Sequence, residues 1–202
     1  MTKGNALSRL LSEYWPAVVL TAGLLALSVY LQTAVYWSPM VLPDDVWLAK
    51  VNVHLTEHPF NIRFFQTYAT LGVHHLFGLS IRESFFSVQF LLTMLLGPLF
   101  FRYLRRLEFD RIWANIGVVL LMTAYPILGA HFAPTHTWDD FWTYLFLVLA
   151  LINLLDHRWI VSAIFLTLGA LAREQVVLYY PILLLMAWWY RRDAPRGQLI
   201  VS

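Results

Sequence analysis

The chain lacks cysteine and is poor in charge. Its 202 residues include no Cys, and only 13% are Asp, Glu, Lys or Arg. The missing thiols exclude a disulfide framework, thiolate metal sites and cysteine nucleophiles. With 59% hydrophobic residues and a mean hydropathy of +0.61, the chain is too apolar for a soluble domain of this length. We therefore expect an integral membrane protein, and the formal net charge of +2 gives no indication of nucleic-acid binding.

Uncharged stretches predict an all-α, polytopic membrane fold with about six transmembrane helices. A helix needs about 20 apolar residues to cross a bilayer. Three stretches are free of charge and close to that length, and three shorter ones need flanking polar residues that reach toward the headgroups. The predicted spans are residues 16–37, 84–101, 112–133, 141–155, 159–172 and 175–190. The first is too long for a signal peptide and no cleavage site follows it, so we expect it to remain as an anchor.

The positive-inside rule orients these spans with both termini in the cytoplasm. Residues 1–13 and the tail 191–202 are then cytoplasmic, and ten of the 14 basic residues lie inside. These ten are Lys3, Arg9, Arg102, Arg105, Arg106, Arg111, Arg158, Arg191, Arg192 and Arg196. Seven acidic residues and six of the seven histidines fall on the outer side. No linker, low-complexity tract or repeat divides the chain, so residues 1–202 are expected to form a single membrane domain.

Residues 38–83 are predicted to form one large outer loop with two or three juxtamembrane helices. Within it, residues 64–81 carry no Asp, Glu, Lys or Arg and could be mistaken for a further span. Such a span would move Arg102 and its basic neighbours outside, which the charge rule disfavours. Gln66, His74 and His75 instead favour a helix at the membrane interface or packed between spans.

The outer loop begins with an acidic pair, Asp44 and Asp45, just beyond the first span. The pair could cap a helix, or one carboxylate could act as a general base whose pKa is raised by burial and by its neighbour. Farther along, Trp47 and His54 share a helical face, which His58 extends by one turn. His54 and His58 could bind a metal, although such a pair more often makes hydrogen bonds at an interface.

Three further motifs place charge on the outer side. Arg63 lies among aromatic residues, where it could reach toward the headgroups or clamp a phosphate. Asp139 and Asp140 stand at the mouth of the fourth span, where Asp139 could cap the helix. Arg173 and Glu174 have almost no loop around them, so they must find partners at the interface. Two interpretations remain open: a local ion pair between the two residues, or a contact to a ligand phosphate.

The order of these motifs resembles the N-terminal half of the GT-C superfamily of membrane glycosyltransferases, over roughly residues 14–190. The resemblance is carried by Asp44-Asp45 after the first span, by Arg63 among the juxtamembrane helices, by the stretch Ala133-Pro134-Thr135-His136-Thr137-Trp138-Asp139-Asp140, and by Arg173-Glu174 within Leu168-Gly169-Ala170-Leu171-Ala172-Arg173-Glu174-Gln175. It implies transfer of a sugar from a polyprenyl-phosphate donor to an acceptor hydroxyl on the outer face of a bacterial cytoplasmic membrane, as part of cell-envelope chemistry. Full members of the family usually carry further spans and often a soluble domain.

The resemblance also implies roles for the outer residues. Asp44 or Asp45 would deprotonate the acceptor, and Arg63 and Arg173 would neutralise the departing phosphate. Secondary donors and sugar ligands would come from His54, His58, His131, His136, Asp139, Asp140 and Glu174. No cofactor is required, since arginine can neutralise the leaving group, although the outer carboxylates could hold a divalent cation. The alternative is a non-catalytic subunit of a larger membrane complex, docked through tryptophans at span ends. A transporter built on the histidines is weaker, because the longest predicted spans carry no charge.

Overall fold

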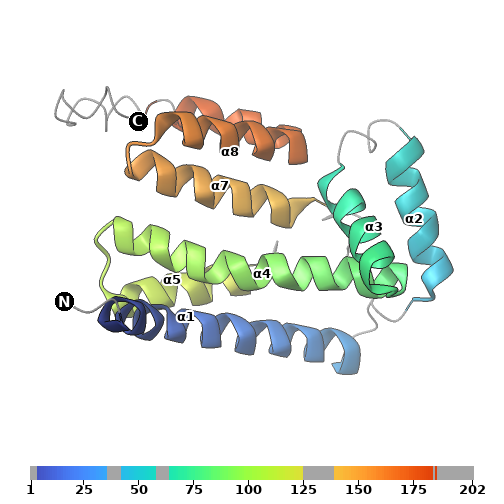
Figure 1. Ribbon diagram of the computed structural model, residues 1–202, viewed down its shortest axis with the longest axis horizontal. Coiled ribbons are helices and arrows are strands. Elements are labelled where there is room, and N and C mark those ends of the chain that lie inside the picture. Colours follow the sequence, from blue (N-terminus) through green and yellow to red (C-terminus); the bar gives the residue numbers. More distant parts are fainter. Residues whose placement is uncertain (1–3, 36–41, 58–63, 125–138, 184, 186–202) are drawn as a thin grey trace.

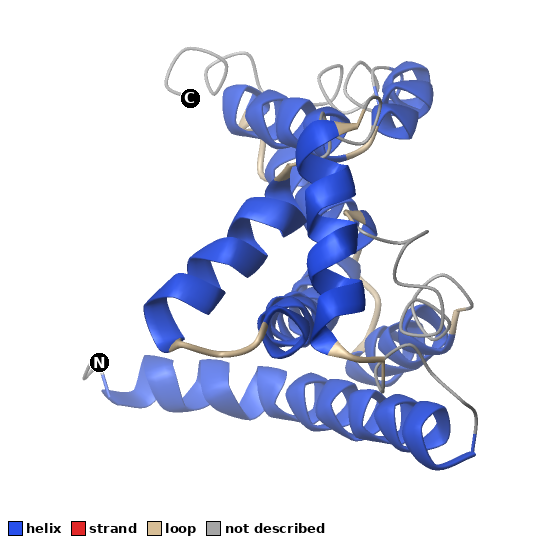
Figure 2. Cartoon of the chain, turned by 90° about the vertical axis from the view of Figure 1, so that its right-hand side faces the viewer, coloured by secondary structure: helices blue, strands red, loops and turns tan. Residues whose placement is uncertain are grey.

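The computed structural model describes residues 4–35, 42–57, 64–124, 139–183 and 185, and these residues form helices and connecting loops without any strand (Figure 2). This confirms the all-α fold class for the described part of the chain. The helices are α1 (Gly4–Tyr30), α2 (Asp44–Thr56), α3 (Phe65–Phe77), α4 (Ile81–Arg106), α5 (Arg111–Thr123), α7 (Asp140–Leu155) and α8 (Trp159–Ala172). A π-helical turn, η1 (Leu31–Val35), extends α1, and a 3₁₀ helix, η4 (Glu174–Tyr179), follows α8.

The longer helices run along one axis and reverse direction from one to the next (Figure 1). Helix α4 is at the centre and contacts α1, α3, α5 and α7, while α8 packs on α7. Helices α2 and α3 cross one end of this bundle and pack against the beginning of α4. The loops joining α4 to α5 and α7 to α8 lie at the opposite end. The bundle therefore has two distinct ends, and the sequence divides its charged motifs between them.

Local signals in the sequence explain where α3 and α4 meet. Gly78 ends α3 with a φ of 66°, a left-handed conformation that glycine adopts without steric cost. Ser80 then begins α4 with a capping box, in which its hydroxyl accepts from the Glu83 N–H at 3.2 Å and the Glu83 carboxylate accepts from the Ser80 N–H at 3.0 Å. These two signals fix the sharp corner from which α3 folds back across the bundle end.

The core lies along α4 and the helices around it. Its buried residues include Leu92, Leu96 and Phe101 of α4, Val118 of α5 and Phe141 of α7. Helices α1 and α4 are in close contact where Gly97 faces the Thr21 side chain, since a Cβ placed on Gly97 would overlap the Thr21 hydroxyl. Small residues at such crossings let two helix backbones come together.

Among the described residues, two helical segments are long and apolar enough to cross a membrane, Ser12–Tyr30 and Ile81–Arg106. Helices α5, α7 and α8 are also apolar but have only 13, 16 and 14 residues. The bounds of α7 and α8 agree with the predicted fourth and fifth spans to within one residue. Helix α5 ends at Thr123, three residues before Pro126, and the rest of the predicted third span lies outside the described residues. The count of six spans stays a prediction.

The predicted sixth span, residues 175–190, does not begin as an α-helix. Residues Glu174–Tyr179 form a 3₁₀ helix, and α-helical residues follow only from 180. The preceding Arg173 is extended, with φ −155° and ψ 121°, so α8 and η4 meet at a sharp turn. A 3₁₀ helix at a connection of this kind tightens the chain into fewer residues per turn.

Candidate functional site

The described parts of three motifs predicted to lie on the outer side are found at one end of the bundle. Asp44 and Asp45 form the first turn of α2, Asp139 and Asp140 begin α7, and Arg173 follows the last residue of α8. These elements gather at the right-hand end of the bundle (Figure 1). We call this region the acidic end.

Asp44 caps a helix other than its own. The N-cap of α2 is Pro43, and no side chain caps that helix. The Asp44 Oδ1 instead accepts a hydrogen bond of 2.8 Å from the backbone N–H of Arg82 in the first turn of α4. The interpretation of this pair as a helix cap therefore holds for Asp44, but the helix that it caps is α4 and not α2, because the open N–H groups of α4 lie within its reach. A carboxylate at a helix N-terminus also interacts favourably with the helix dipole.

Asp139 caps a distant helix in the same way. It occupies the N-cap position of α7, yet its side chain makes no cap bond to α7. Its Oδ1 accepts from the backbone N–H of Gln66 at 2.8 Å, in the first turn of α3. Asp139 is only 2% exposed, so this charge-assisted bond is buried. Asp139 therefore begins α7 as predicted, but its side chain caps α3 instead of α7.

Gln66 connects the helices that meet at this end. It is 1% exposed, and its amide donates to the Phe85 carbonyl of α4 at 3.2 Å and accepts from the Trp142 indole of α7 at 3.1 Å. Phe85 lies three residues beyond Arg82, so the bond from Gln66 and the bond from Asp44 reach α4 about 5 Å apart along its axis. The first two turns of α4 thus carry both the α2 and the α3 contacts.

Asp140 and Arg173 form an ion pair between the start of α7 and the end of α8. The Asp140 side chain is 7% exposed and that of Arg173 is 22% exposed. A guanidinium held against a carboxylate is fixed in position. The structure therefore brings together two of the predicted residues that lie 33 positions apart.

Asp45 and Glu174 differ from the buried Asp139 and Asp140, since both are exposed, as is Asp44. Asp45 lies beside Asp44 in the first turn of α2, and Glu174 begins η4 directly after Arg173. A carboxylate that removes a proton from a substrate must be reachable from outside the protein. At the acidic end, Asp45 meets this requirement and lies next to the carboxylate that anchors α4.

The face of α2 that Trp47 and His54 were predicted to share is the face that α2 buries against the bundle. Trp47, Val51 and His54 are all buried on it, and the Trp47 ring packs against Phe85 at a centroid distance of 5.0 Å. Lys50 extends over the same indole, with its Nζ 5.1 Å from the ring centroid. Partial burial lowers the pKa of Lys50 from its ordinary value. This packing fixes α2, and with it Asp44 and Asp45, on the bundle.

Other predicted site residues lie outside the described residues: Arg63, His58, His131 and His136. The His54–His58 metal site is therefore untested. In the part of the chain that the structure describes, no three His, Asp or Glu side chains are grouped so as to hold a metal ion.

Two residues of the site were not predicted as such. Arg82 offers its backbone N–H to Asp44 and its guanidinium to the Leu42 carbonyl at 3.3 Å. Gln66 was noted only as a polar residue in an uncharged stretch. A lone amide on an apolar helix is the available signal, because such a group must find partners when it is buried.

No protein-family model, curated protein or solved structure matches the chain.

Proposed function

We propose that the chain is a polytopic membrane protein of about six spans, of the kind that the GT-C resemblance implies. Its acidic end would face the outside of a bacterial cytoplasmic membrane and its termini the cytoplasm. Two helices of spanning length and the alternating helix directions support this placement. The short helices α2 and α3, which lie across the acidic end, would be the juxtamembrane helices of the outer loop (Figure 2).

The proposed activity is inverting transfer of a sugar from a polyprenyl-phosphate donor to an acceptor hydroxyl. The observation that carries it is an exposed carboxylate, Asp45, beside an end of the bundle that is fixed by Asp44. Asp45 takes the proton of the acceptor hydroxyl as that oxygen bonds to the anomeric carbon. The bond from this carbon to the lipid-phosphate oxygen breaks, and the phosphate leaves with the electron pair.

The departing phosphate needs positive charge in a fixed position. Arg173 provides a guanidinium that Asp140 holds in place and that is still partly exposed. Arg82 provides another beside Asp44, with one N–H engaged by the Leu42 carbonyl. In this proposal Asp44 positions the loop, Asp45 acts as the base, and the arginines bind the lipid phosphate.

The test is sugar transfer by the purified chain in lipid nanodiscs, with a panel of labelled polyprenyl-phosphate sugars and a hydrophilic alcohol acceptor. Asp45→Asn should lower the rate by about 100-fold or more, the usual contribution of a general base. Glu57→Gln is the matched control, since Glu57 is an exposed carboxylate at the other end of α2. Transfer by Asp45→Asn within a few-fold of the unmodified chain would refute the assignment.

A non-catalytic subunit is the second candidate, and one observation favours it. The carboxylates of Asp44, Asp139 and Asp140 all make contacts within the chain that hold helices together. An acidic motif could thus be retained for structure alone. In that case the unmodified chain transfers no sugar from any donor, and a second membrane protein purifies with it in fixed ratio from mild detergent.

A further inference from the structure

A groove of about 860 Å³ lies between α1 and α4, toward the end of the bundle opposite the acidic end. The same two helices are those long and apolar enough to cross a membrane. One stretch of the groove is apolar, with Val18, Leu95 and Leu99 among its lining residues. The other stretch is lined by Arg102, Arg105, Arg106 and Glu13. The groove is therefore amphipathic along its length, with three arginines against one carboxylate.

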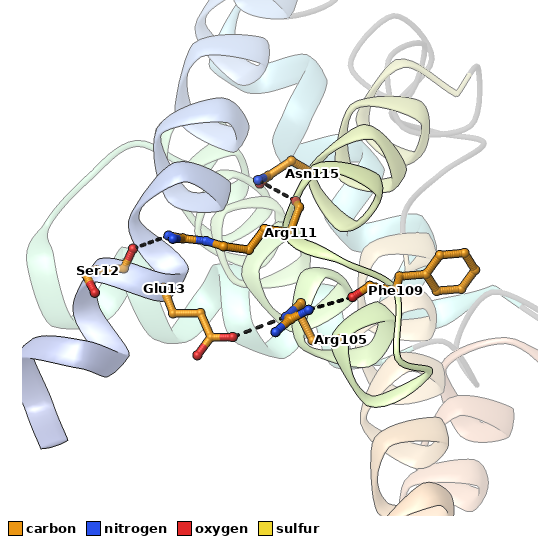
Figure 3. A network of polar contacts seen from close by, with 6 residues as sticks. All are labelled: Ser12, Glu13, Arg105, Phe109, Arg111 and Asn115. Atoms are coloured by element: carbon orange, nitrogen blue, oxygen red, sulfur yellow. Dashed lines mark hydrogen bonds and ion pairs between the residues drawn. The ribbon is translucent and has the colours of Figure 1, made fainter.

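Arg105 maintains the shape of the groove. Its Nε contacts the Glu13 carboxylate of α1 at 3.2 Å, and its guanidinium donates to the Phe109 carbonyl at 2.7 Å (Figure 3). Next to it, Arg111 donates to the Ser12 carbonyl of α1 at 2.6 Å. These bonds tie the beginning of α1 to the end of α4 and to the start of α5. The contacts that fix the walls of the groove therefore involve Arg105 and Arg111, and not Arg102 or Arg106.

Arg102 and Arg106 carry positive charge in excess of their partner. Both contact the carboxylate of Asp156, Arg106 at 3.3 Å and Arg102 at 3.9 Å. One carboxylate cannot neutralise two guanidiniums. The Arg106 side chain is 51% exposed and that of Arg102 is 44% exposed, whereas the Asp156 side chain is only 15% exposed. Their remaining N–H groups can therefore meet an anion that approaches from the groove.

We propose that this groove binds one anionic phospholipid of the inner leaflet. The phosphodiester accepts hydrogen bonds from Arg102 and Arg106, and an acyl chain lies along Leu95 and Leu99. Guanidinium groups are well suited to phosphate oxygens, and basic pockets between spans on the cytoplasmic side are suited to anionic headgroups. A free phosphate would use the arginines but not the apolar stretch. The inference rests on the membrane placement proposed above and is independent of sugar transfer.

Native mass spectrometry of the detergent-purified chain tests this with phosphatidylglycerol, phosphatidylcholine and inorganic phosphate as probes. We expect one phosphatidylglycerol to be retained in preference to phosphatidylcholine. Inorganic phosphate at the same concentration should not displace it. Equal retention of the two lipids, or displacement by inorganic phosphate, would overturn the proposal.

Matched variants locate the site. R102Q/R106Q should weaken phosphatidylglycerol binding about 30-fold, from a factor of about five for each arginine near a membrane surface. R158Q removes one charge from the same end of the bundle outside the groove lining and makes none of the wall contacts, so it should leave binding within about twofold, whereas R102Q alone should weaken it about fivefold. Equal losses from R158Q and R102Q would contradict a specific site.

A further variant changes no charge, so it tests the site even if R102Q/R106Q misfolds. Leu95 is 45% exposed, so Leu95→Trp can fill the apolar stretch of the groove without disturbing the core. Retention of phosphatidylglycerol should fall, while the thermal unfolding temperature stays near that of the unmodified chain. Undiminished retention in Leu95→Trp would refute the acyl-chain position.

Discussion

The buried ion pair at the acidic end makes a sharp prediction about stability. Arg173→Met leaves the Asp140 carboxylate, whose side chain is 7% exposed, without its guanidinium. Breaking a buried pair by removing one partner typically costs about 3–5 kcal/mol. The Arg173 side chain keeps 22% of its surface exposed, so water can reach the pair and the lower figure applies. We expect a loss of about 3 kcal/mol, or a fall in Tm of about 6–12 °C for a chain of this size.

Thermal unfolding in detergent, followed by far-UV circular dichroism, measures this loss. The double variant Asp140→Asn/Arg173→Met removes both charges and should recover most of the stability, because no buried charge is left without a partner. Arg158→Met is the control, since Arg158 is exposed at the opposite end and its loss should change stability by no more than about 0.5 kcal/mol. An Arg173→Met variant within about 1 kcal/mol of the unmodified chain would refute the reasoning.

Three further predictions concern single contacts. Asp139→Ala should cost about 1–2 kcal/mol by removing the cap on Gln66, with faster hydrogen exchange confined to α3, whereas Asp139→Asn retains an acceptor and should lose less. Gly97→Ala should destabilise the chain by about 1–3 kcal/mol in thermal unfolding, and the added Thr21→Ala should restore part of it by removing the overlapping hydroxyl. The lowered pKa of Lys50 means that the unfolded chain binds more protons, so stability rises as pH increases from that lowered pKa toward 10.5. Lys50→Met should lack this rise in unfolding measurements across alkaline pH; an identical pH profile would contradict the burial argument.

Helix positions were predictable where a continuous apolar run ends at charged residues. The fifth predicted span coincides with α8, because Arg158 precedes it and Arg173 follows it. The buried face of α2 was equally readable from the spacing of Trp47 and His54. The 3₁₀ helix after Arg173 could not be predicted, since its apolar sequence is compatible with an α-helix or a 3₁₀ helix.

The partners of the site residues could be predicted only in part. The sequence correctly placed Asp139 at the start of a helix. It could not show which helix the side chain caps, because any backbone N–H within reach can serve as the donor. Asp44 likewise reaches α4, 38 residues away in sequence. Alternation of the spans did predict that Asp140 and Arg173 lie at the same end. Their pairing depends on how α7 packs on α8, which no local pattern encodes.

The proposed membrane placement requires that the acidic end and the arginine-lined end of the bundle lie on opposite sides of a membrane. The chain has no cysteine, so an introduced cysteine is its only thiol. Glu57→Cys marks the acidic end and Arg158→Cys the opposite end, and both positions are exposed. In intact bacterial cells with a permeable outer envelope, a membrane-impermeant maleimide should label Glu57→Cys at once and Arg158→Cys only after the cytoplasmic membrane is opened. Equal labelling of both positions, or the reverse order, would contradict the account.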